Sequence, residues 1–215
     1  LFEDEYHVSQ YKLQSTLSGD WQRGLTNNVY VALEYMKAIQ EKYPEIVTIA
    51  DAKRADIGNT NAGYVKAIFD ELKFEAVTVN PYFGREALQP FLDQKDKGII
   101  VLCKTSNPGS GEFQDGLWPK VAANVAKNWN ANNNCLLVVG ATFPEELSQV
   151  REIVGEMTLL VPGIGVQGGD VAKTVKAGLN SNHAGMIINS SRGIIFADNP
   201  RLETQKLRDE INKYR

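Results

Sequence analysis

Short apolar runs alternate with longer amphipathic stretches along most of this chain. Each run is a few residues long, apolar at successive positions, and bounded by Gly, Pro, Asn or Asp. Such runs are typical of strands in a parallel sheet that is covered by helices. We predict strands at Ile46–Ala50, Ala76–Val79, Ile99–Leu102, Leu136–Val139, Leu159–Val161 and Met186–Ile188, with a weaker one around His7–Gln14.

The stretches between these runs have the period of helices. Their apolar residues recur at three- and four-residue steps, which places them on one face of a helix. Asp198–Pro200 has the composition of an N-cap that leads into the last helix. The predicted buried faces are Leu25, Val29, Ala32, Leu33, Met36 and Ile39; Val121, Val125 and Trp129; Leu147, Val150 and Val154; and Leu207, Ile211 and Tyr214.

Repeated βα units of this kind form either a doubly wound sheet or a closed barrel, and periodicity alone leaves both open. The length of 215 residues suits a single domain, residues 1–215. A barrel needs eight strands, and the chain begins at Leu1 without a Met. We therefore expect an N-terminally incomplete (β/α)8 TIM barrel whose first strand is absent from this sequence.

Composition narrows the possible partners. The formal net charge of -3 argues against a nucleic-acid surface or one attracted to membranes. We see neither an apolar run long enough to span a membrane nor the pattern of a signal peptide. Cys103 and Cys135 lie in strand-like runs and outside any metal-binding spacing, so we expect buried free thiols, no metal site and a cytoplasmic location.

Charged residues cluster where the first confident strand ends, in the segment IADAKRADIGNT (Ile49–Thr60). Asp51 and Lys53 are two residues apart, so strand geometry predicts that they share a face, and Asp56 follows in the next turn. In a βα barrel this end of the strand faces the catalytic mouth. A structural ion pair is the alternative, because buried charges must pair in either case.

Two glycine-rich segments follow the last two predicted strands: PGIGVQGGD (Pro162–Asp170) and INSSRGI (Ile188–Ile194). Gly168 and its neighbours have the composition of a helix start, whose free N–H groups bind anions. Arg192 adds a cation suited to phosphate, so we favour a phosphate site over plain connecting turns. The segment TSNPGSGEFQD (Thr105–Asp115) is predicted to be a functional loop, with a passive surface loop as the alternative.

Taken together, DAKRADIGNT, TSNPG, PGIGVQGGD and NSSRG resemble the orotidine 5′-phosphate decarboxylases, particularly their bacterial-type branch. The resemblance extends in order from about Val8 to the C-terminus. It implies a barrel that decarboxylates orotidine 5′-monophosphate to UMP in pyrimidine biosynthesis without a metal or an organic cofactor. It also implies a homodimer.

The resemblance implies roles for individual residues. Lys53 would protonate C6 of the pyrimidine beside Asp51 and Asp56, and Lys12, in QYKLQ, would match a further catalytic lysine, although Leu13 replaces the proline usual after it. Asp56, Ile57 and Thr60 would complete the neighbouring subunit's site. The implied base and phosphate contacts are Ser106, Pro162, Gln167 and Arg192.

Three other functions remain as alternatives. A Mg-dependent sugar-phosphate decarboxylase or aldolase, such as 3-keto-L-gulonate 6-phosphate decarboxylase, resembles this chain in the DxKxxD motif. A barrel epimerase with a His/Asp metal site is disfavoured because the chain has only His7 and His183, neither at a predicted strand end. A non-catalytic phosphate-binding barrel is disfavoured by the intact set of Asp51, Lys53 and Asp56.

Overall fold

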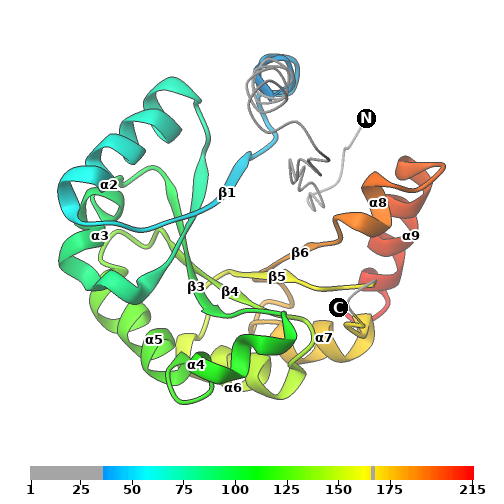
Figure 1. Ribbon diagram of the computed structural model, residues 1–215. Helices are drawn as coiled ribbons and strands as arrows, with labels where there is room; N and C mark the ends of the chain where they lie inside the picture. The colour runs from blue at the N-terminus through cyan, green and yellow to red at the C-terminus, as the bar shows by residue number, and fades with distance from the viewer. Residues whose placement is uncertain (1–35, 166–167) are drawn as a thin grey trace.

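A curved parallel sheet with helices along its outside makes up the part of the chain that the computed structural model describes, residues 36–165 and 168–215 (Figure 1). Its strands lie side by side in chain order, and every neighbouring pair is parallel. They are β1 (Ile49–Arg54), β2 (Ala76–Val79), β3 (Gly98–Lys104), β4 (Cys135–Val139), β5 (Leu159–Pro162) and β6 (Met186–Asn189).

Helices connect successive strands, and residues 36–42 are helical before β1. The α-helices are α2 (Gly58–Val65), α3 (Gly84–Leu92), α4 (Gly111–Gln114), α5 (Trp118–Asn124), α6 (Pro144–Val154), α7 (Val171–Gly178), α8 (Arg192–Ile195) and α9 (Pro200–Asn212). Two π-helical turns, η1 (Lys66–Glu71) and η4 (Val125–Trp129), extend α2 and α5. The 3-10 turns are η2 (Pro81–Phe83) and η3 (Pro108–Ser110).

The strand order decides between the two candidate folds. A doubly wound sheet reverses its strand order and carries helices on both faces. Here each strand pairs with the next in sequence, and the helices follow the outside of the arc (Figure 1). The six described strands are therefore an arc of a βα barrel, as predicted. The weak strand predicted at His7–Gln14 lies outside the described residues.

The sheet is apolar on both faces because each face has its own core. Side chains that point outward, such as Val77, Val101 and Leu137, pack against helix residues that include Phe91. Those that point inward form a separate layer of Ala76, Ile100, Val138 and Leu160, with Ile49, Leu102, Leu136 and Ile187 packed against it. Burial on both faces explains why the strands appear in the sequence as continuous apolar runs.

The predicted elements differ from the structure in two places that concern function. We expected the first strand at Ile46–Ala50, but β1 begins later, at Ile49, and continues to Arg54, so Asp51 and Lys53 lie within the strand. The predicted loop Thr105–Asp115 is largely helical, since η3 starts at Pro108 and α4 follows. Proline suits the first position of a helical turn because its fixed φ matches and no N–H is needed there.

The helix ends agree with the sequence at both predicted starts. Asn199 caps α9 by accepting a hydrogen bond from the Leu202 N–H, and Asp170 caps α7 by accepting one from the Lys173 N–H. In the described part of the chain, no helix is both long enough and apolar enough to cross a membrane.

Candidate active site

A cavity of about 370 Å³ opens at the carboxyl ends of the strands. This is the end of a βα barrel at which the loops after the strands can surround a ligand. All of the described strands except β2 contribute to the cavity, either directly or through the loop that follows them. Its lining consists of Asp51, Lys53, Leu102, Thr105, Ser106, Asn107, Val138, Leu160, Pro162, Gly163, Ile164, Asn189, Ser190, Ser191, Arg192 and Gly193.

An ion pair between Lys53 and Asp51 stands on the β1 side of this cavity. The Lys53 Nζ lies 2.5 Å from Asp51 Oδ1. The Asp51 side chain is only 15% exposed, whereas that of Lys53 is 43% exposed. A recessed carboxylate thus fixes an ammonium that remains accessible from the cavity, and this ammonium can stabilise negative charge or donate a proton.

The two side chains lie where β1 departs from regular strand geometry. Lys53 has a φ of +47°, in the left-handed region that non-glycine residues rarely adopt. The pairing of β1 with β2 is also irregular between Ala50 and Arg54. Asp51 and Lys53 both line the cavity, as predicted, but they lie in a stretch where the strand is distorted.

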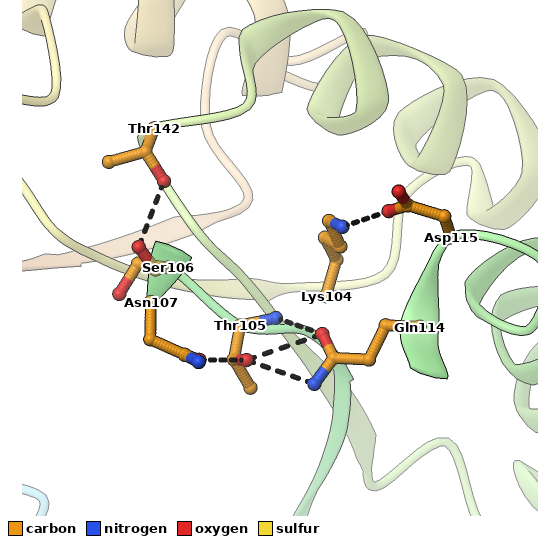
Figure 2. A network of polar contacts seen from close by, with 7 residues as sticks. All are labelled: Lys104, Thr105, Ser106, Asn107, Gln114, Asp115 and Thr142. Atoms are coloured by element: carbon orange, nitrogen blue, oxygen red, sulfur yellow. Dashed lines mark hydrogen bonds and ion pairs between the residues drawn. The ribbon is translucent and has the colours of Figure 1, made fainter. Parts of the chain in front are cut away.

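The segment after β3 brings Ser106 to the cavity, and its neighbours are tied down (Figure 2). The Gln114 side chain clamps Thr105: its Oε1 accepts the Thr105 N–H at 2.8 Å, and its Nε2 donates to the Thr105 hydroxyl at 3.0 Å. That hydroxyl donates to Asn107 Oδ1 at 2.6 Å, and the Thr142 hydroxyl donates to the Ser106 carbonyl at 3.3 Å. The segment is therefore anchored at both of its ends.

Gly140 allows the same segment to lie against the end of β4. A Cβ at position 140 would be 2.7 Å from Ser106 Cα, a separation that real contacts do not reach. The Gly140 N–H donates to the Lys104 carbonyl across the two strands. Glycine is required here because a side chain would displace Ser106 from the cavity wall.

Lys104 lies on the opposite side of β3, away from the cavity. The register of β3 with β4 shifts between Leu102 and Lys104, so that Lys104 pairs with the outward-facing Val139. Its ammonium, in a side chain only 1% exposed, pairs with Asp115 (Figure 2). The same ammonium lies 4.5 Å from the centre of the Phe143 ring. The bulge thus turns a charged side chain out of the barrel interior, and Lys104 anchors the far end of the Thr105–Asp115 segment.

The opposite wall comes from β5, β6 and the segments that follow them. Pro162 and Asn189 are register partners, and both line the cavity. Ser190, Ser191 and Arg192 continue the wall at the start of α8. Arg192 is exposed, so it can bind an anion at the cavity rim.

The structure brings together five of the predicted site residues: Asp51, Lys53, Ser106, Pro162 and Arg192 all line the cavity. Four others lie elsewhere. Asp56 and Ile57 are in the connection from β1 to α2, Thr60 is in the first turn of α2, and Gly168, with a φ of +88°, lies just before α7. Lys12 and Gln167 lie outside the described residues.

Sequence reasoning missed polar residues that share this site. Asn189 is 6% exposed, and its Oδ1 accepts no hydrogen bond from the described residues. A buried amide oxygen without a donor is costly, so a ligand that supplies an N–H or O–H would be stabilised there. The signal was present: Asn189 ends an apolar run inside the NSSRG motif, the position at which barrel strands carry functional side chains. Thr105 and Asn107 were within the predicted loop but were not singled out.

Positive charge stands on two walls of the cavity. A cation, Lys53, stands beside the recessed carboxylate of Asp51 on one wall, and a second cation, Arg192, stands on the other. Over residues 36–165 and 168–215, no group of three His, Cys, Asp or Glu side chains is arranged to hold a metal ion. The arrangement suits a small ligand with an anionic group at one end and a reacting atom near Lys53 at the other.

A βα barrel with these groups at the carboxyl ends of its strands belongs to the class of barrel enzymes that act on small phosphorylated molecules. A family model described as "Orotidine 5′-phosphate decarboxylase / HUMPS family" matches residues 5–207. The chain therefore belongs to the orotidine 5′-phosphate decarboxylase / HUMPS family.

Individual relatives agree with this assignment. The chain is 50% identical over 189 residues to an orotidine 5′-phosphate decarboxylase of a Janthinobacterium species, covering 82% of this chain and 70% of the relative. Among solved structures, Leishmania donovani OMP decarboxylase matches with a TM-score of 0.81 at 38% identity, covering 87% of this chain and 75% of that one. Leishmania donovani UMP synthase matches with a TM-score of 0.84 at 41% identity, covering 87% of this chain but only 43% of that longer one.

Proposed function

We propose that this chain decarboxylates orotidine 5′-monophosphate to UMP in pyrimidine biosynthesis, without a metal or an organic cofactor. The observation that carries the proposal is the Lys53–Asp51 pair at the wall of a cavity whose other wall holds Arg192. Relatives that carry the name orotidine 5′-phosphate decarboxylase and are about half identical support the same reaction.

Lys53 does the chemistry at C6 of the pyrimidine. When CO2 leaves, the electron pair of the broken bond stays on C6, where no adjacent carbonyl can delocalise it. The Lys53 ammonium stabilises this charge and then donates a proton to C6, which yields UMP and a neutral lysine that regains its proton from solvent. Asp51 holds the ammonium in place through its 2.5 Å contact.

The remaining wall residues position the nucleotide. Arg192 binds the phosphate, with Gln167 and the glycines around Gly168 beside it. Ser106 contacts the pyrimidine, and Pro162 packs against it. Phosphate binding draws the segments around Ser106 and Gly168 together over the base, which excludes water from the reacting carbon.

A homodimer completes the site. Asp56, Ile57 and Thr60 are absent from the lining of the cavity in their own chain, and the Ile57 side chain is 61% exposed. In the proposed dimer, these three residues reach the neighbouring subunit's cavity, where Asp56 becomes the second carboxylate beside Lys53. Lys12 supplies a further catalytic cation.

A reducing, cytoplasmic setting is part of the proposal. Cys103 and Cys135 are both free and both buried, and they form no disulfide with each other. Free buried thiols are usual in proteins of reducing compartments.

The first experiment follows the decay of orotidine 5′-monophosphate absorbance with purified protein, with and without EDTA. We expect turnover that EDTA leaves unchanged. Lys53→Ala should abolish turnover while UMP still binds in calorimetry. As a matched control, Lys206→Ala should leave turnover intact, because Lys206 pairs with Glu203 on the exposed face of α9.

Each of the other possible results of these assays would contradict one part of the proposal. Turnover that EDTA abolishes would indicate a metal-dependent member of the family. Absence of turnover with retained UMP binding would indicate a phosphate-binding barrel without the chemistry. Full activity of Lys53→Ala would remove Lys53 from the mechanism.

A further inference from the structure

We infer that Thr78 is a positioning residue for the reaction: its hydroxyl group sets both the backbone of Lys53 and the carboxylate of Asp51. The inference rests on the proposed decarboxylase function and extends it to a residue outside the cavity lining. Three observations support it: the pairing of β1 with β2, the conformation of Lys53, and two hydrogen bonds of the Thr78 side chain.

The pairing of β1 and β2 leaves Thr78 opposite more than one residue. Ala50 pairs with Val77 and Arg54 pairs with Val79, so Asp51, Ala52 and Lys53 on β1 share the single position 78 on β2. Backbone hydrogen bonds cannot continue in register across such a bulge. The Lys53 N–H donates instead to the Thr78 hydroxyl oxygen at 2.9 Å. The side chain thus replaces a missing rung of the ladder.

This hydrogen bond holds Lys53 in an unfavourable conformation. A φ of +47° costs energy for a residue with a Cβ, and such conformations persist only where the surroundings enforce them. The Thr78 hydroxyl accepts the N–H of the residue that carries this φ. Without it, the N–H would lose this partner, and the backbone of Lys53 could relax toward an extended conformation.

The same hydroxyl also fixes Asp51. It has one proton to donate, and two oxygens are near: Asp51 Oδ1 at 3.0 Å and the Ala50 carbonyl at 3.5 Å. The carboxylate is both closer and charged, so it takes the proton. Asp51 Oδ1 is also the atom that contacts the Lys53 ammonium. One hydroxyl therefore links the lysine backbone to the carboxylate that holds the lysine side chain.

The location of Thr78 separates positioning from substrate contact. The residue is 1% exposed and is not part of the cavity lining. The inward position before it on β2, Ala76, belongs to the apolar inner layer, where a hydroxyl would be costly unless it is hydrogen-bonded. A valine would fill the same volume, so the hydroxyl group itself is the feature that needs an explanation.

The test compares Thr78→Val, which keeps the shape, with Thr78→Ser, which keeps the hydroxyl. We expect Thr78→Val to lower kcat by about 10- to 100-fold, the effect of losing a hydrogen bond to a charged group. KM for orotidine 5′-monophosphate and the affinity for UMP should stay within about threefold, because Thr78 does not touch the ligand. Thr78→Ser should retain most of kcat.

Thr48→Val is the matched control. Thr48 is also buried, at 6% exposed, and its hydroxyl also donates to a carboxylate, that of Glu75. It precedes β1 at the opposite end of the barrel from the cavity. We expect Thr48→Val to lower stability but to leave kcat unchanged. Equal losses of kcat in Thr48→Val and Thr78→Val would overturn the inference, because both would then reflect general destabilisation.

A second readout does not depend on the reaction. In amide hydrogen exchange followed by NMR, the Lys53 N–H should be protected in the wild type and in Thr78→Ser but exposed in Thr78→Val. Unchanged protection, or unchanged kcat, in Thr78→Val would overturn the inference. If the wild type itself fails to turn over orotidine 5′-monophosphate, the proposed function fails, and the exchange result alone decides the positioning claim. If Thr78→Val does not fold, Thr78→Ala replaces it with the same expectations.

Discussion

Asp51, Thr78 and Asn189 occupy corresponding inward positions near the carboxyl ends of three strands. The inward residue before each of them is apolar: Ile49 on β1, Ala76 on β2 and Ile187 on β6. On these three strands, the inward face therefore changes from apolar to polar within two residues. At this scale, a polar side chain takes the place of an apolar one at the next inward position of these three strands, and the outward face that packs against the helices stays apolar.

The two cysteines provide a pH prediction at the residue scale. Burial raises the pKa of the Cys103 thiol from 9.0 to about 12 and that of Cys135 to about 11. Above about pH 9 the unfolded chain therefore releases protons that the folded chain keeps. The stability that these thiols contribute is complete below pH 9 and is lost as the pH rises from 9 through the folded-state pKa values of about 11 and about 12. We expect the free energy of unfolding to be about 1–3 kcal/mol lower at pH 10 than at pH 8.

Urea unfolding at a series of pH values measures this effect. Other groups also titrate above pH 9, so the informative comparison is with Cys103→Ala/Cys135→Ala, in which the alkaline decline should be shallower. The native thiols should also react slowly with a thiol reagent at pH 8, because thiolate is the reactive form. An equally steep decline in the double variant would show that the cysteines do not cause it.

At the scale of elements, the strands were predictable and their irregularities were not. Ala76–Val79 was predicted with the bounds that β2 has, because a run of four buried residues between polar neighbours is visible in one chain segment. The bulges near Lys53 and Lys104 depend on how each strand pairs with its neighbour, and a single segment does not contain that information. For the same reason, Thr78 looked like any other strand residue.

The candidate site was predictable to the extent that its residues are charged or lie in motifs. Lys53, Ser106 and Arg192 were assigned from motifs at strand ends, and all three line the cavity. Asn189 was missed because an amide at the end of an apolar run resembles an ordinary turn residue until its burial is known. Burial and hydrogen-bond partners are three-dimensional properties, so sequence patterns predict where a site lies better than they predict its supporting contacts.

Lys104 allows a prediction about the segment between β3 and α5. Replacing it with methionine removes a buried ammonium but keeps the length and the apolar packing, so stability should change little. The segment Thr105–Asp115 loses its outer anchor, and we expect kcat/KM for orotidine 5′-monophosphate to fall by about tenfold. Steady-state kinetics and urea unfolding of Lys104→Met measure both effects.

Two further variants control for this prediction. Asp115→Asn leaves the buried ammonium without its carboxylate, and we expect it to lower the free energy of unfolding by about 1–3 kcal/mol. Lys206→Met removes an exposed ammonium from the surface of α9 and should alter neither kinetics nor stability. If Lys104→Met matches the wild type in kcat/KM, the anchor does not contribute to the site.

At the scale of the whole molecule, the predicted site residues do not all line one cavity. Lys53 lines the cavity, but Asp56, three residues later, does not, and its carboxylate accepts the N–H of Ile57 at 2.7 Å. The next strand end also carries exposed apolar surface, since Tyr82 is 84% exposed and Phe83 is 51% exposed. Exposed aromatic residues of this kind are enriched at interfaces, so this surface is available to the proposed dimer.

The proposed dimer makes a prediction that only a shared site satisfies. Lys53→Ala and Asp56→Ala should each be inactive alone, because each removes one part of every site. In a mixed dimer, one site carries both defects and the other carries neither, since the symmetric interface supplies each site with Lys53 from one chain and Asp56 from the other. Unfolding and refolding the two variants together in equal amounts should then restore about a quarter of wild-type activity, because about half of the dimers are mixed and each has one intact site.

A mixture of Lys53→Ala and Asp51→Ala is the control for this experiment. Both residues stand on the same wall of one cavity, so this mixture should stay inactive. No activity in the first mixture would place Asp56 within the site of its own chain, and restored activity in the control would show that Lys53 and Asp51 do not serve the same site.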